Sequence, residues 1–101
     1  MTGTLNTASE NRIAVWAITP NGAALAARMA AAFPGAEVLG SDRLERLPGP
    51  ALRFASLGEA VAARCHRYTG HVLIMAAGIV GRVVAPRVTH NAQDPPVVVV
   101  A

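Results

Sequence analysis

The fold of this chain follows from one stretch, His71-Val-Leu-Ile-Met-Ala-Ala-Gly-Ile-Val-Gly-Arg-Val-Val-Ala-Pro86. Its first five residues form a mostly apolar run, which is typical of a strand buried on both faces. Small residues follow, and residues 79–85 then read as a short helix that carries one arginine and ends at Pro86. A strand that turns directly into a helix leaves backbone N–H groups free at its carboxyl end. The stretch therefore predicts an α/β unit with an anion or ligand site at the turn.

A similar unit lies nearer the amino terminus. Residues 12–18 are a continuous apolar run and predict a second buried strand. A helix is expected over 20–33, because Thr19 is a good N-cap and Pro20 suits the first helical position. Its large apolar residues share one face and are expected to be buried there. These are Leu25, Met29 and Phe33.

The remaining segments complete an alternation of strands and helices. We expect a short strand over 36–39, a brief extended piece over 51–55 and a final strand over 97–100. Ser56 and Glu59 have the spacing of a capping box, which predicts a helix that reaches about residue 68. The fold class is therefore α/β, with a small, mainly parallel sheet of about four strands and helices on both faces.

Length and composition limit the chain to one small domain. It has 101 residues, 52% of them hydrophobic, and a mean hydropathy of +0.38, which excludes a fully disordered chain. Residues 1–11 are polar and predict a disordered leader, so the α/β domain is expected over 12–101. The sequence stops directly after a valine strand, and we expect a partial chain or a short homologue of a longer protein.

The charge pattern excludes several classes of partner. The net charge is +3, and the nine basic residues are all arginines spread along the sequence with few aromatic residues between them. This pattern argues against nucleic-acid binding and suits a small molecule with several carboxylates. Neither a signal peptide nor a membrane-spanning run is expected, and a single cysteine fits a reducing cytoplasm.

Three segments resemble the N-terminal region of the cobalamin-biosynthesis G-type proteins, the cobalt-precorrin-5A hydrolase family. They are Ile13-Ala-Val-Trp-Ala-Ile-Thr-Pro-Asn-Gly22, the stretch from Met75 to Pro86, and Asp94-Pro-Pro-Val-Val-Val-Val100, in matching order and spacing. Full-length members continue into a glycine- and serine-rich segment that this sequence does not include.

The resemblance implies a step in the anaerobic route to vitamin B12. Family members hydrolyse the lactone of cobalt-precorrin-5A, giving cobalt-precorrin-5B and acetaldehyde. The substrate is a tetrapyrrole that carries its own cobalt, so the resemblance implies no separate cofactor and no metal site in the protein.

The candidate substrate-binding residues lie at the carboxyl ends of the first and third predicted strands. They are Thr19, Asn21, Gly22, Ala77, Gly78 and Arg82. Backbone N–H groups near Gly78 would stabilise an oxyanion, and Arg82 would clamp a propionate or acetate group. Three structural alternatives remain open: Thr19 caps the helix, Gly78 serves the backbone angles of a tight turn, and Arg82 is solvated.

His90 and Asp94 are the candidate catalytic residues, because a histidine–carboxylate pair can activate water for attack on a lactone. Structural alternatives exist for both residues. Asp94 can form the turn before Pro95, and His90 can simply be exposed. The other histidines and the cysteine are expected to be structural rather than metal ligands. They are His66, His71 and Cys65.

Two functional classes remain from the sequence. The first is the hydrolase, or its N-terminal part. The second is a non-catalytic module that binds a corrinoid or docks onto a partner. Either could form a homo-oligomer or associate with a separately encoded C-terminal chain.

Overall fold

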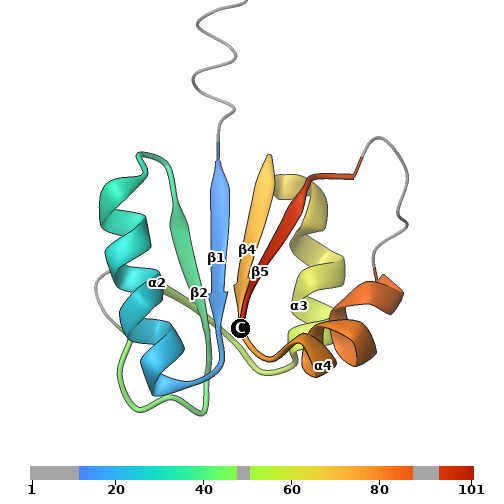
Figure 1. Ribbon diagram of the computed structural model, residues 1–101, viewed down its shortest axis with the longest axis horizontal. Helices are drawn as coiled ribbons and strands as arrows, with labels where there is room; N and C mark the ends of the chain where they lie inside the picture. The colour runs from blue at the N-terminus through green and yellow to red at the C-terminus, as the bar shows by residue number, and fades with distance from the viewer. Residues whose placement is uncertain (1–11, 48–50, 88–93) are drawn as a thin grey trace, which may run out of the picture.

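A five-stranded parallel sheet forms the centre of the protein (Figure 1). The computed structural model describes residues 12–47, 51–87 and 94–101, so the predicted leader at 1–11 lies outside it. The strand order is β3-β2-β1-β4-β5. The strands are β1 (Ile13–Ala17), β2 (Glu37–Ser41), β3 (Ala51–Phe54), β4 (Gly70–Ile74) and β5 (Val97–Val100). The predicted α/β class is confirmed. The brief extended piece expected over 51–55 is the strand β3, which brings the sheet to five strands rather than about four.

Helices cover both faces of the sheet. They are α2 (Pro20–Ala32), α3 (Leu57–Arg64), which continues into the 3-10 turn η1 (Cys65–Arg67), and α4 (Ala77–Ile79). Alternate residues of the central strand β1 point to opposite faces. Ala14 and Trp16 belong to the core that α3 and α4 cover, whereas Val15 and Ala17 belong to the core that α2 covers. All four are fully buried, as the uninterrupted apolar run predicts.

The helix α2 begins and ends where its sequence indicates. The Thr19 Oγ1 atom accepts a hydrogen bond of 3.0 Å from the Gly22 N–H, and Pro20 is the first helical residue. The expected buried face is partly wrong, because Phe33 is the C-cap and its side chain is 51% exposed. The residues in closest contact with the sheet are small, which lets the helix approach it closely. They are Gly22, Ala23 and Ala26, with Leu25 and Met29 packed at the flank.

The connection from β2 to β3 covers the sheet where a helix would otherwise lie. Leu44 is buried in the same core as α2, and Leu47 packs directly over Gly40 of β2. A Cβ atom at Gly40 would overlap with the end of the Leu47 side chain, so a larger residue here would require Leu47 to move. The apolar residues of this segment therefore replace a helix as the cover of the sheet.

The helical segment that starts with α4 is irregular. It widens into a π-helical turn, η2 (Val80–Val84), in which the Ala85 N–H donates to the Val80 carbonyl, and tightens into a 3-10 turn, η3 (Ala85–Arg87). Pro86 was predicted to end the helix, yet the helical backbone continues through it to Arg87. Proline offers no N–H to the carbonyl four residues earlier, and its ring crowds that carbonyl. The widened turn before Pro86 accommodates this conflict.

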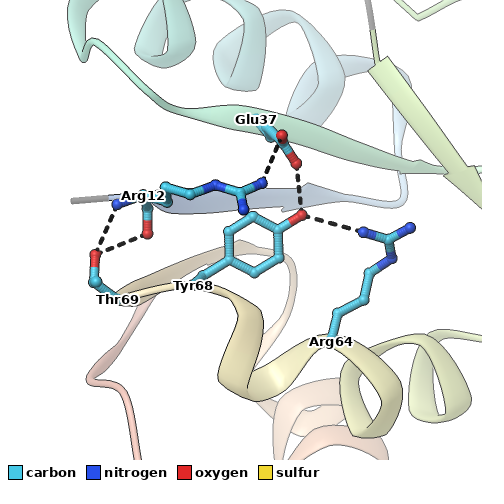
Figure 2. A network of polar contacts seen from close by, with 5 residues as sticks. All are labelled: Arg12, Glu37, Arg64, Tyr68 and Thr69. Atoms are coloured by element: carbon cyan, nitrogen blue, oxygen red, sulfur yellow. Dashed lines mark hydrogen bonds and ion pairs between the residues drawn. The ribbon is translucent and has the colours of Figure 1, made fainter. Parts of the chain in front are cut away.

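A polar network closes the amino edge of the sheet and ties three strands together (Figure 2). The Tyr68 hydroxyl donates to the Glu37 carboxylate at 2.7 Å, and the Arg12 guanidinium contacts the same carboxylate at 2.8 Å. The Thr69 hydroxyl donates to the Arg12 carbonyl at 2.8 Å. The hydrogen bond from Tyr68 and the charge of Arg12 lower the pKa of Glu37. Because all the partners are engaged with one another, we assign this network to the stability of the fold.

Candidate functional site

Two turns meet at the carboxyl edge of the sheet. The strands β1 and β4 are neighbours that pair up to Ala17 and Ile74. The chain leaves β1 toward the α2 face and leaves β4 toward the α4 face (Figure 1). Where neighbouring strands send their connections to opposite faces, an open parallel sheet has its ligand crevice. A Cβ atom at Gly22 would lie 3.3 Å from Ile74, so the first turn of α2 rests against the end of β4.

Of the three predicted binding residues in the turn after β1, Thr19 and Gly22 have structural roles and Asn21 is exposed. The capping interpretation of Thr19 is confirmed, since its Oγ1 atom accepts from the Gly22 N–H. The Thr19 hydroxyl proton remains a donor for a ligand. Gly22 is buried between Thr19 and Ile74 and permits their close approach. Asn21 is exposed at the start of the helix, where its amide is available to a ligand.

The turn after β4 presents bare backbone to solvent. Ala76 is the N-cap of α4 and supplies no side-chain hydrogen bond, while Ala77 and Gly78 are both exposed. The first N–H groups of a helix have no partner within it. A Cβ atom at Gly78 would meet nothing within 4 Å, and the positive φ found in the described glycines belongs to Gly35. Gly78 is therefore not needed for the backbone angles of the turn.

Arg82 folds back over this turn. Its Nε atom donates to the Gly78 carbonyl at 3.3 Å, and the residue is exposed. This bond holds the side chain beside the α4 turn and leaves the terminal N–H groups of the guanidinium for another acceptor. Arg82 is thus neither fully solvated nor fully engaged, and it can hold a carboxylate near Gly78.

Asp94 does not lie with these residues. It precedes β5 at the amino edge of the sheet, where its Oδ1 atom lies 3.3 Å from the His66 Nε2 atom. At about 3.3 Å per residue, the five residues of β4 separate the two edges by about 16 Å. The other predicted catalytic residue, His90, lies outside the described residues. The structure therefore does not bring Asp94 to the oxyanion site predicted at Gly78.

The contact between His66 and Asp94 was missed from the sequence. The two residues come from η1 and from the segment before β5, and no local pattern links them. The His66 side chain is 64% exposed, whereas that of Asp94 is only 6% exposed. The pair resembles the histidine–carboxylate arrangement expected for His90, at a different edge of the sheet.

A buried chain of hydrogen bonds connects Trp16, His71 and Cys65. The Trp16 Nε1–H donates to the His71 Nδ1 atom at 3.0 Å. On the other side of the ring, the His71 Nε2 atom lies 2.9 Å from the Cys65 carbonyl oxygen. Burial lowers the pKa of His71 and raises that of the Cys65 thiol, to which the charge of Asp94 contributes further. A neutral ring satisfies both contacts, so the predicted structural role fits these residues.

A groove beside the carboxyl edge was also missed. It lies between α2 and residues 43–47 and has a volume of about 940 Å³. Ile18 and Pro20, the neighbours of Thr19, line one part of it, and the basic residues around it are Arg28, Arg43 and Arg46. Two of these arginines follow a predicted strand in the sequence. This position after a strand could have indicated a ligand site, because the carboxyl ends of parallel strands gather at one edge of the sheet.

Two properties of the described ranges bear on the class of site. No group of three or more His, Cys, Asp or Glu side chains there is arranged to hold a metal ion. Among the helices of those ranges, none combines the length and hydropathy that crossing a bilayer requires.

Comparison with known proteins agrees with the segments that carried the resemblance. A family model described as "Cobalamin synthesis G N-terminal" matches residues 59–101. The chain is 38% identical over 98 residues to the cobalt-precorrin-5A hydrolase of Salmonella typhimurium, a match that covers 95% of this chain but 27% of that protein. No solved structure matches the chain significantly. These two matches support an N-terminal region of the cobalamin-synthesis G type.

Proposed function

We propose that this chain acts in cobalamin biosynthesis as the substrate-binding N-terminal part of a cobalt-precorrin-5A hydrolase. The observation that carries the proposal is that two turns, after β1 and after β4, lie together at the carboxyl edge of the sheet, in a chain that is 38% identical over 98 residues to that enzyme. One turn offers the Thr19 hydroxyl and the Asn21 amide. The other offers free backbone N–H groups and a positioned arginine.

In the reaction, water attacks the lactone carbonyl and the ring oxygen leaves as the carbonyl reforms, which gives a carboxylate. Backbone N–H groups at Ala77 and Gly78 stabilise the negative charge that develops on the carbonyl oxygen. Arg82 holds a peripheral carboxylate and so fixes the lactone over the turn. Ring opening leaves a hydroxyl group on the two-carbon fragment. As that hydroxyl loses its proton and becomes the carbonyl of acetaldehyde, the carbon–carbon bond to the macrocycle breaks, and the macrocycle keeps the electron pair and takes up a proton.

A second function is a corrinoid-binding module without chemistry of its own. The position of Asp94 favours it, because the described residues place no histidine–carboxylate pair beside Gly78. The chain also spans only 27% of the length of the curated relative. The group that activates water would then come from the rest of a longer protein or from a partner chain.

The two functions are separated by incubating the purified chain with cobalt-precorrin-5A. Acetaldehyde is measured with an alcohol dehydrogenase assay, and binding is followed by the absorption of the corrinoid. Binding with acetaldehyde release supports the hydrolase, whereas binding alone supports the module. A chain that neither binds the corrinoid nor releases acetaldehyde would refute both.

Within this experiment, the Arg82→Glu variant tests the α4 turn. We expect about tenfold weaker corrinoid binding, because one charge-assisted contact to a carboxylate is replaced by repulsion. Arg67→Glu is the matched control, since Arg67 is exposed in η1 at the amino edge of the sheet.

A further inference from the structure

The groove between α2 and residues 43–47 has an apolar surface suited to a flat ligand. Its wall on α2 is formed by Ala23, Ala24 and Ala27, and Leu44 and Leu47 line the opposite side. Alanine side chains are short, so a rigid ring can approach the helix closely. A volume of about 940 Å³ lies at the upper end of the range for small-molecule sites. The groove is therefore large enough for a macrocycle.

Its charged residues are predominantly cationic. Arg28 comes from α2, Arg43 and Arg46 come from the opposite segment, and Glu45 is the one carboxylate among the residues that line the groove. Cations on both sides of an apolar surface repel one another until an anion lies between them. Such an arrangement fits a ligand with an apolar body and carboxylates at its periphery.

The three arginines of the groove have no side-chain partner in the described part of the chain, unlike four of the other six arginines. The side chains of Arg12, Arg53, Arg64 and Arg82 each donate to an oxygen atom within the protein. Those of Arg28, Arg43 and Arg46 make no hydrogen bond or ion pair with any described residue. Their guanidinium groups are exposed and free to form bidentate contacts with carboxylates.

We propose that this groove binds the macrocycle of a polycarboxylated tetrapyrrole, with Arg28 on one side and Arg43 and Arg46 on the other holding its peripheral carboxylates. The inference rests on the proposed function, which supplies the class of ligand. It adds a binding surface on the α2 face, beside Thr19 and separate from Arg82 on the α4 face. The ring lies along the alanines of α2, and its edge reaches the carboxyl edge of the sheet at Ile18 and Pro20.

The test uses uroporphyrin, a porphyrin with carboxylates on every pyrrole ring, as the probe. Its binding to the full chain is followed by fluorescence anisotropy at fixed salt. We expect the Arg43→Glu/Arg46→Glu double variant to bind about 100-fold more weakly, from the loss of two charge-assisted contacts. Arg28→Glu should weaken binding about tenfold, and Glu45→Gln should tighten it.

Arg67→Glu is the matched control and should change the dissociation constant by less than about twofold. Arg67 lies at the amino edge, and the length of β4 separates that edge from the carboxyl edge that the groove borders, so ionic screening weakens its effect. All the substituted side chains are exposed, and thermal unfolding of each variant verifies that it is folded.

Three results would contradict the proposal that this groove binds a tetrapyrrole. The double variant could bind uroporphyrin as well as the unsubstituted chain does, a neutral octaalkyl porphyrin could bind equally tightly, or a single-stranded oligonucleotide could displace the probe. Each would leave the proposed function standing if the chain still binds cobalt-precorrin-5A and Arg82→Glu weakens that binding. Failure of cobalt-precorrin-5A binding itself would count against the proposed function.

Discussion

Two residues with buried polar atoms, Trp16 and His71, lie in the core on the α3 side of the sheet and determine which protonation state of His71 fits there. Trp16 and His71 are almost fully buried, and each satisfies the other through one hydrogen bond. The second ring nitrogen of His71 is satisfied by the Cys65 carbonyl. A protonated ring would carry hydrogens on both nitrogens, and the Nδ1 hydrogen would then face the Trp16 N–H. The core therefore favours the neutral histidine.

The first prediction concerns the pH dependence of stability. Burial lowers the pKa of His71 in the folded state below the ordinary 6.5, so the unfolded chain binds the proton more readily. Stability from this group is complete above pH 6.5 and falls as the pH drops below it, by at most about 1.4 kcal/mol per pH unit until the folded pKa is reached. Urea unfolding between pH 7.5 and 5.5 measures the change.

The control for this prediction is His71→Gln, which keeps polar atoms at the site but does not titrate there. Its free energy of unfolding is expected to be lower at pH 7.5 and to fall less steeply toward pH 5.5. Equal slopes for the two proteins would show that a group other than His71 is responsible. Keeping the pH above 5 separates this effect from Glu37, whose contribution is lost at lower pH.

The second prediction contrasts two glycines at the carboxyl edge. A Cβ atom at Gly22 would lie 3.0 Å from the Thr19 Oγ1 atom and 3.3 Å from Ile74, so Gly22→Ala should destabilise the protein by about 1–3 kcal/mol. Gly78 has open space around it, so Gly78→Ala should be neutral or stabilise the helix by up to about 1 kcal/mol. Thermal unfolding of the two variants provides the comparison. A similar loss in both would show that the α4 turn is packed rather than open.

At the scale of elements, the two edges of the sheet are protected differently. The edge strand β3 carries Arg53, whose guanidinium donates to the Leu44 carbonyl at 2.6 Å and places a charge on that edge. The other edge strand, β5, consists of four valines, of which Val98 is 57% exposed. An uncharged, β-branched edge strand is a template for pairing with another chain. We therefore expect β5 to limit the solubility of the chain.

The third prediction follows from this edge. Val98→Lys should leave the free energy of unfolding within about 0.5 kcal/mol, because the side chain is exposed, and should reduce aggregation on heating. Val100 lies on the same face of the same strand but packs against the core that α2 covers. Val100→Lys is therefore the matched control and should destabilise the fold. Light scattering during a thermal ramp, with urea unfolding, distinguishes the two effects. Unchanged aggregation in Val98→Lys would exclude this edge as its cause.

At the scale of the whole molecule, the two ends of the parallel sheet carry different polar groups: those at the amino edge are engaged with one another, and those at the carboxyl edge are exposed. The amino edge holds the engaged network of Arg12, Glu37 and Tyr68, and the contact between His66 and Asp94 (Figure 2). The carboxyl edge holds the exposed turns and borders the arginine-lined groove. The exposed turns therefore lie at the edge where open parallel sheets bind ligands.

The sequence by itself determined the elements and the class of the fold. The apolar runs, the Thr19 cap and the Ser56 cap depend on residues within one helical turn or one strand, so a local pattern is sufficient to find them. The same locality explains why β5 was located correctly and why the turn after β4 was identified as exposed backbone.

Only the tertiary structure decided which segments meet. Strand order, the contact of Asp94 with His66, the burial of His71 beside Trp16 and the groove beside α2 all join residues far apart in the sequence. Such contacts arise because strands from different parts of the chain pair side by side in the sheet. No spacing along the sequence encodes them, which is why neither the contact of Asp94 with His66 nor the arginine-lined groove was predicted.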